Sequence, residues 1–160
     1  MKRKTVLYGL IFMLMALAMP FVSIARDVDP IVSTDWLEKN LANPKVTVID
    51  IRKVEDYKAG HIPNAVSAVY GSWAVMKSGL RNELPPVDDL FDVIGSAGIG
   101  ADSIVVLVGK ADNVPNRTDV TRVAWTLKYA GIQNVAILDG GYDKWVAEKK
   151  TVSTDAVKPK

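Results

Sequence analysis

The stretch that decides the fold is VTVIDIRKVEDYKAGHIPNA, residues 46–65. Its first part, Val46 to Ile51, is a β-branched run that is short and apolar enough to be a buried strand. Lys53 to Ala59 then has the pattern of one or two helical turns. Asp50 and Arg52 leave the strand together, so we expect them to form a local ion pair or to bond the backbone of the next turn. The stretch is therefore the beginning of a βα unit.

The second part of this stretch, from Gly60 to Ala65, is turn-forming. Gly60 can end a helix in the left-handed conformation, which we predict here, and Pro63 fixes the turn that follows. His61 is the only histidine of the chain. We expect it to bond within its own turn, because a lone imidazole without a partner nucleophile has little acid–base work to do.

Outside this stretch, short apolar runs alternate with segments of helical spacing. We expect further strands at residues 66–70, 103–108 and 135–138. We expect helices after the capping residues 33–35, over 87–97, over 120–130 and over 142–147. This alternation predicts an α/β fold of parallel βαβ units, with a central, mostly parallel sheet and helices on both faces.

Three local expectations complete this outline. Thr118 or Asp119 is the expected N-cap of the helix over 120–130. Residues 71–86 are expected to be irregular, since Pro85 and Pro86 close them. The polar tail from 153 to 160 is expected to be loose.

The first 25 residues have the layout of a secretory signal peptide. Three basic residues at positions 2–4 precede the apolar run Val6 to Met19, and Ser23 and Ala25 are small residues suited to cleavage after Ala25. This layout predicts a periplasmic or secreted domain. The alternative is an uncleaved membrane anchor, because residues 6–25 are just long enough to span a bilayer. Pro20 and the small residues favour cleavage.

Charge and cysteine content exclude several functions. Cleavage would remove three of the 20 basic residues and none of the 18 acidic ones, which leaves 17 against 18. Without a basic surplus to neutralise phosphates, no nucleic-acid partner is expected. The chain also contains no cysteine, so it has no thiolate nucleophile, no persulfide carrier and no thiolate metal site.

Two ordered blocks of residues resemble the rhodanese-like domain family. The first is the pattern D-x-R … Y-x-x-G-H-I-P-x-A, formed by Asp50, Arg52, Tyr57, Gly60, His61, Pro63 and Ala65. The second is formed by Ile104-Val105-Val106, Arg122, Gly131, Val135, Leu138-Asp139-Gly140-Gly141 and Trp145. The resemblance implies structural roles for these motif residues. It also implies a three-layer rhodanese-like domain over residues 26–154, followed by a flexible tail or linker start at 155–160.

The resemblance places the family's catalytic cysteine at about Val108, where this chain has no nucleophile. In active rhodaneses a tight loop points its backbone N–H groups at that sulfur, and the next helix adds its positive end. Here the corresponding loop, 108–117, is expected to be longer than the compact active form. We interpret it as a degenerate active-site loop formed by Val108, Gly109, Lys110, Asp112, Asn113, Asn116 and Arg117. Arsenate-reductase and phosphatase versions of the fold need the same cysteine, so they are disfavoured too.

The loop leaves two interpretations open. Lys110 and Arg117 flank a helix N-terminus and could hold a small anion there. However, Asp112 and Asp119 bring negative charge to the same place, and Asp119 would itself satisfy the free N–H groups. An ordinary capped surface loop is therefore favoured. The oxygen-bearing side chains of the loop lack the spacing of a calcium loop, so neither a metal nor a cofactor is expected.

The lengthened loop and its flanks look most like the N-terminal half of a tandem thiosulfate or 3-mercaptopyruvate sulfurtransferase, a half that is catalytically silent in that family. We therefore predict an exported, non-catalytic binding or regulatory module related to sulfur metabolism. Its partner would be a second rhodanese domain, another exported protein or a small anion, and a membrane only if the first 25 residues are not cleaved. The alternative is the N-terminal half of a sulfurtransferase whose cysteine-bearing domain lies outside this chain.

Overall fold

A five-stranded parallel sheet forms the centre of the computed structural model, which describes residues 26–159. Its strands lie in the order β1-β7-β6-β2-β3. Their bounds are Ile31–Val32 (β1), Val46–Asp50 (β2), Val66–Ser67 (β3), Ile104–Val108 (β6) and Val135–Leu138 (β7). Every residue of β2 and β6 is buried, as expected for β-branched strands that are covered on both faces.

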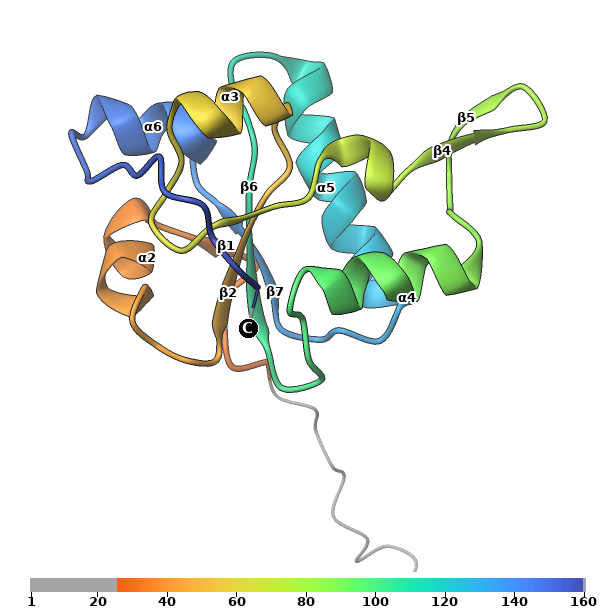
Figure 1. The fold of residues 1–160 in the computed structure, drawn as a ribbon, viewed down its shortest axis with the longest axis horizontal. Coiled ribbons are helices and arrows are strands. Elements are labelled where there is room, and N and C mark those ends of the chain that lie inside the picture. The colour runs from red at the N-terminus through yellow and green to blue at the C-terminus, as the bar shows by residue number, and fades with distance from the viewer. Residues whose placement is uncertain (1–25, 160) are drawn as a thin grey trace, which may run out of the picture.

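Helices cover both faces of this sheet (Figure 1). The helices α2 (Thr34–Asn40) and α6 (Gly141–Ala147) lie on one face, whereas α4 (Val87–Ser96) and α5 (Val114–Tyr129) lie on the other. The helix α3 (Val54–Ala59) follows β2 at the end of the sheet where the strands finish. The predicted α/β fold, with a parallel sheet between two helical layers, is confirmed.

Two apolar clusters occupy the two faces, because successive side chains of a strand point to opposite sides. One cluster contains Val48 and Val106 of the central strands together with Trp145 of α6. The other contains Ile49 and Leu107, the next residues along the same two strands, and the helices α4 and α5 pack against them. The β-branched runs of the sequence thus supply both cores.

The start of α5 corrects the sequence-based expectation. The helix begins at Val114, where the side chain of Asn113 accepts a hydrogen bond of 2.9 Å from the N–H of Asn116. Pro115 lies in the first turn, where its missing N–H removes no helical hydrogen bond. The predicted N-cap at Thr118 or Asp119 is therefore wrong, since both residues lie inside the helix.

The start of α5 at Val114 also sets the length of the loop that precedes the helix. The connection from β6 to α5 is only residues 109–113, so the long loop expected over 108–117 is not present.

Residues 71–86 are not irregular, contrary to the prediction. The 3-10 turn η1 (Tyr70–Ser72) begins this segment, and the strands β4 (Val75–Lys77) and β5 (Leu80–Glu83) form a hairpin that projects from the body of the domain (Figure 1). Ser78 and Gly79 both have positive φ, as two-residue hairpin turns require.

Gly60 is not left-handed, contrary to the prediction. Its φ of 164° and ψ of 138° are extended backbone that any residue adopts. A Cβ atom at this position would lie 2.8 Å from the hydroxyl oxygen of Tyr142, so the glycine is needed for this close approach. The left-handed residue of the turn is Asn64, with φ of 66°.

The ends of the described chain hold two further findings. The tail predicted to be loose, residues 153–160, is fixed at its first residue. Ser153 and His61 exchange two backbone hydrogen bonds of 2.8 and 2.9 Å. The export segment predicted at residues 1–25 lies outside the described residues. Between residues 26 and 159, no helix is long and apolar enough to cross a membrane.

Candidate functional site

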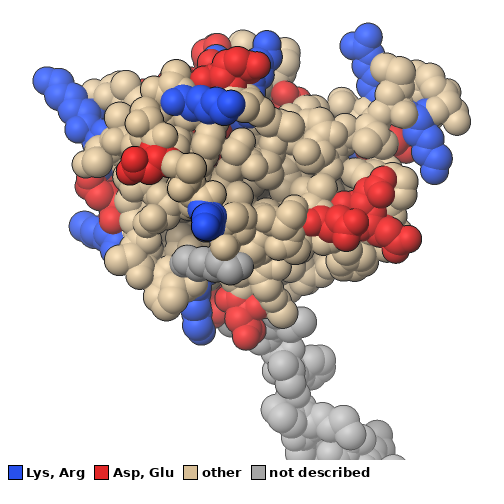
Figure 2. All heavy atoms as spheres, viewed as in Figure 1, with Lys and Arg blue, Asp and Glu red and all other residues tan. Residues whose placement is uncertain are grey.

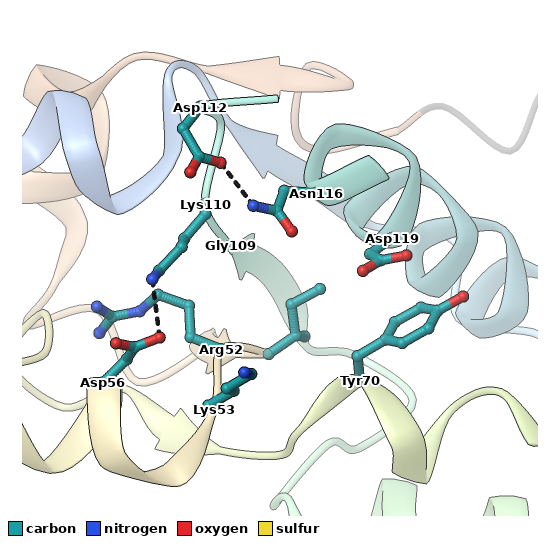
Figure 3. Close-up of a pocket in the computed structure, with 10 residues that line it drawn as sticks. Arg52, Lys53, Asp56, Tyr70, Gly109, Lys110, Asp112, Asn116 and Asp119 are labelled. Atoms are coloured by element: carbon teal, nitrogen blue, oxygen red, sulfur yellow. Dashed lines mark hydrogen bonds and ion pairs between the residues drawn. The ribbon is translucent and has the colours of Figure 1, made fainter. Parts of the chain in front are cut away.

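A pocket of about 500 Å³ lies where β2 and β6 end (Figure 3). The carboxyl ends of neighbouring parallel strands are where open α/β sheets place their ligands. Residues that follow β2 form one wall, and residues that follow β6 form the other. The lining consists of Ile51, Arg52, Lys53, Asp56, Tyr70, Gly109, Lys110, Asp112, Asn116 and Asp119.

A buried ion pair supports this end of the sheet. Arg52 Nη2 lies 2.6 Å from Asp50 Oδ2, and Arg52 Nε donates to both carboxylate oxygens at 3.0 and 3.1 Å. Arg52 Nη2 also donates to the carbonyl of Gly60 at 2.8 Å. Its guanidinium lies 3.5 Å from the ring centroid of Tyr142. The ion pair and the backbone bond suggested by the sequence are both present, and they join β2, the turn and α6.

His61 is part of the turn rather than of the pocket. Its Nδ1 donates to the carbonyl of Tyr57 at 3.0 Å, and the two rings stack with centroids 3.9 Å apart. The Tyr57 hydroxyl in turn donates to the carbonyl of Ala65 at 2.7 Å, and burial raises the pKa of this tyrosine. Pro63 lies half-buried in the same turn. His61 therefore holds the turn together, which is the role that the sequence favoured.

Val108, which the sequence resemblance places at about the position of the family's nucleophile, is part of the core. It is 0% exposed and belongs to the same apolar cluster as Tyr57 and Trp145. The pocket is lined instead by Gly109. A Cβ atom on Gly109 would lie 2.4 Å from a methyl carbon of Val120. The structure thus leaves no room for a side chain at Gly109 and buries the side chain at Val108.

The backbone of the loop is held by neighbouring side chains. The N–H of Ala111 donates to Asp143 Oδ2 of α6 at 3.1 Å, and the carbonyl of Ala111 accepts from Arg117 Nε at 2.8 Å. Asn116 Nδ2 donates to Asp112 Oδ1 at 2.5 Å. These polar groups bond to one another instead of pointing at a bound sulfur or anion.

Lys110 crosses the pocket from the loop to α3 (Figure 3). Its Nζ lies 3.0 Å from Asp56 Oδ2. This hydrogen bond lowers the pKa of Asp56 and raises that of Lys110. Because both side chains are about a third exposed or more, the pair contributes little to stability. It does neutralise Lys110, one of the two cations that the sequence suggested for an anion site at this loop.

Asp119 and Tyr70 lie at the other end of the pocket (Figure 3). Burial raises the pKa of Asp119, and the neighbouring Tyr70 hydroxyl lowers it by a smaller amount. Burial likewise raises the pKa of Tyr70, and the charge of Asp119 adds to that shift. Asp119 therefore faces the pocket from inside α5 and does not cap the helix.

The motif Gly140-Gly141 allows the start of α6 to pack closely against the loop. Both residues have left-handed backbone, with φ of 69° and 59°. A Cβ atom on Gly141 would lie 2.3 Å from the carbonyl oxygen of Gly109, so only glycine fits there. The N–H of Tyr142 donates to that same carbonyl at 3.0 Å. The motif thus has a structural role that its left-handed backbone explains.

The two remaining motif residues lie away from the pocket. Trp145 is fully buried, and its Nε1 donates to the carbonyl of Thr151 at 2.8 Å. Arg122 points toward the hairpin, where it donates to the carbonyl of Asn82, and its guanidinium lies 4.8 Å from the ring centroid of Trp125. The structure does not bring either residue into the site.

Sequence reasoning missed Tyr142, Asp143 and Asp56, each of which holds a part of the site. Two of them directly follow the glycine pair, which is the signal that marks a tight turn. Asp56 lies six residues after Asp50, so the rule that neighbouring parallel strands end together would have placed it beside the loop. Among residues 26–159, no group of three or more acidic or histidine side chains could hold a metal ion.

Fold and site together define a parallel α/β domain with the motif framework of a sulfurtransferase and no thiol. The chain belongs to the rhodanese-like domain family, which matches residues 33–148. It is 30% identical over 131 residues to a putative thiosulfate sulfurtransferase of Mycolicibacterium smegmatis, covering 81% of this chain and 45% of that protein. It is also 30% identical over 143 residues to thiosulfate/3-mercaptopyruvate sulfurtransferase 2 of Arabidopsis thaliana, covering 81% of this chain and 40% of that protein.

A solved structure agrees with the fold. The 3-mercaptopyruvate sulfotransferase SseA from Escherichia coli superposes with a TM-score of 0.70 at 24% sequence identity, covering 83% of this chain and 53% of SseA. At that identity the likeness concerns the fold alone. The chain spans less than half the length of the two curated relatives named above.

Proposed function

We propose that this chain is an exported rhodanese-like domain without sulfurtransferase activity of its own, and that it acts as a non-catalytic binding or regulatory module in sulfur metabolism. The observation that carries the proposal is the burial of Val108 at the nucleophile position, in a chain with no cysteine. Sulfur transfer in this family needs a thiolate, and neither the carboxylate of Asp112 nor that of Asp119 can carry sulfane sulfur.

The loop supports a binding role over a latent active site. A persulfide site needs free backbone N–H groups aimed at the sulfur. Here Asn113 caps α5, Asp143 accepts from the N–H of Ala111, and Asp56 pairs with Lys110. The capped-loop interpretation is therefore favoured over an anion site, and a macromolecular partner is the more plausible ligand. That partner would be a second rhodanese domain or another exported protein.

A thiosulfate:cyanide assay on the purified full chain tests the proposal. We expect thiocyanate formation equal to the protein-free background, with a cysteine-bearing rhodanese as positive control. Turnover above background would overturn the proposal. A thermal-shift titration with thiosulfate completes the test, since a saturable stabilisation would favour the anion site over the capped loop.

Export is part of the same proposal. Cleavage after Ala25 would give a mature chain that begins at Arg26. Intact-mass measurement of the protein recovered from the periplasmic fraction of an expressing bacterium tests this. A chain that still carries its first 25 residues and sediments with membranes would favour the anchored alternative.

A second candidate function is that of a silent N-terminal half beside a cysteine-bearing domain. It is favoured by the coverage of the relatives, since the chain matches 45% and 40% of the two named above. Reading the coding sequence beyond Lys160 tests it. A stop codon, with no neighbouring gene for a cysteine-bearing rhodanese, would count against it.

A further inference from the structure

Exposed apolar side chains gather in a groove beside the β4–β5 hairpin. The groove, of about 740 Å³, runs between the β4–β5 hairpin and α4, and residues of α5 also line it. We call it the hairpin groove and define it by Met76, Val87, Trp125 and Tyr129, which are 67%, 61%, 51% and 64% exposed. Aromatic residues and methionine are enriched at the cores of protein interfaces.

The groove is held in shape before any partner arrives. Trp125 and Tyr129 stack with ring centroids 5.6 Å apart. Arg122 lies over Trp125 and donates to the carbonyl of Asn82 in the hairpin. This side chain therefore ties the hairpin to α5. A preorganised surface loses less conformational entropy on binding.

Charge on the two sides of the groove is of opposite sign. Lys77 and Arg81 are exposed on the hairpin, whereas Asp88, Asp89 and Asp92 are exposed on α4. Figure 2 shows the basic side chains over the hairpin and an acidic cluster over the end of α4 that lies nearest to it. The apolar groove lies between the two clusters.

This arrangement is complementary to its own image. In a two-fold dimer the same surface is used by both copies, so an element on one side of the axis meets the element on the other side, and the contact occurs twice. A two-fold axis through the groove would place the basic hairpin of each copy on the acidic α4 of the other, twice. A partner of a single charge sign would repel one of the two clusters.

We propose that the hairpin groove is the interface of a two-fold dimer of this chain, with the hairpin of each copy lying against α4 of the other. The apolar residues of the two grooves are buried against each other, and the charges on both sides fix the register.

Because the chain has no cysteine, an introduced thiol is unique, and cross-linking of the full chain is unambiguous. A copy with Met76→Cys and a differently tagged copy with Val87→Cys are co-expressed and oxidised. We expect a disulfide-linked pair that carries both tags. The matched control pairs Val146→Cys with Val152→Cys, two residues that are also exposed and lie outside the groove, and should not cross-link.

Charge reversal gives an independent measurement by sedimentation at low salt. Lys77→Glu with Arg81→Glu in one copy, and Asp88→Lys with Asp89→Lys in another, should each weaken self-association at least tenfold. Mixing the two copies should restore dimers, because both contacts become attractive again. A wild-type chain that stays monomeric, a mixture without recovery, or a cross-link of Met76→Cys to a different protein would overturn the proposal.

Discussion

Two regions at the same end of the sheet, the turn of residues 50–65 and the loop of residues 109–113, differ in how well they keep the family motif. In the turn of residues 50–65, motif residues hold the fold together through the pair of Asp50 with Arg52 and the stack of His61 on Tyr57. In the loop of residues 109–113, which contains no cysteine, polar groups of the loop bond to neighbouring side chains. The comparison teaches that this part of the family motif maintains the fold, so its presence alone does not indicate catalysis.

The two regions also differ in what their charges contribute. The pair of Asp50 with Arg52 is almost fully buried, whereas the pair of Lys110 with Asp56 is about a third exposed or more. Removing one partner of a buried pair leaves an uncompensated charge in the interior, which is costly. An exposed pair is screened by water and salt. Stability measurements can therefore separate the framework from the loop.

The largest effect is expected from breaking the buried pair. Asp50→Asn keeps the side-chain shape and leaves the Arg52 charge uncompensated, so it should lower the free energy of unfolding by about 3–5 kcal/mol. Urea unfolding followed by circular dichroism measures this. Asp56→Asn is the matched control in the loop region and should change the midpoint much less. Equal losses for the two variants would remove the distinction between framework and loop.

A smaller loss of stability is expected at the contact between Gly60 of the turn and Tyr142 of α6. Gly60→Ala places a Cβ atom against the Tyr142 hydroxyl, now 2.8 Å away, and should cost about 1–3 kcal/mol through overpacking. The backbone at Gly60 is extended, so no conformational strain adds to this cost. Tyr142→Phe removes the obstructing oxygen and should recover most of the loss in the double variant. A loss that persists with Tyr142→Phe would mean that contact with the hydroxyl is not its cause.

The position of the α5 N-cap distinguishes the short loop of the structure from the longer loop that the sequence predicts. Asn113→Ala removes the acceptor for the N–H of Asn116 and should cost about 1 kcal/mol. Thr118→Ala, at a position that the sequence alone predicts as a possible cap, changes a residue inside the helix and should cost less. Both are compared by thermal unfolding. A larger loss for Thr118→Ala would indicate that the helix begins later than Asn113 implies.

These local results show what the sequence could and could not predict. The strands, the helical layers and the pair of Asp50 with Arg52 follow from periodicity and a short sequence separation. The cap of α5 was missed because Thr118 and Asp119 compete with Asn113 on propensity alone, and only the short connection from β6 decides between them. Gly60 was assigned to the right turn for the wrong reason, since its contact with Tyr142 joins residues 82 positions apart in the chain.

The pocket also shows what could not be predicted from the sequence. Alignment to a motif places the missing nucleophile at Val108, but it does not reveal that this side chain points into the core. Both faces of β6 are covered, so the burial of Val108 depends on where the strand ends, and the sequence does not mark that position. The loop's own hydrogen bonds, such as Asp143 with Ala111, are equally invisible because the partners come from different elements.

No gain of activity is expected from placing a cysteine at position 108. Val108→Cys replaces two buried methyl groups by one sulfur and should cost about 1 kcal/mol, as for other small losses of core volume. The new thiol would be buried among apolar side chains, where it stays protonated and out of reach, so we expect neither thiosulfate:cyanide turnover nor rapid labelling by a thiol reagent. Val114→Cys, at a position that is 72% exposed, is the matched control and should label at the rate of a free thiol. Fast labelling or turnover by Val108→Cys would show that the loop opens and that only the cysteine is missing. Slow labelling and no turnover would show that a cysteine at position 108 is not sufficient for the chemistry, because the loop also lacks the geometry that a thiolate needs, although the framework of residues 50–65 is intact.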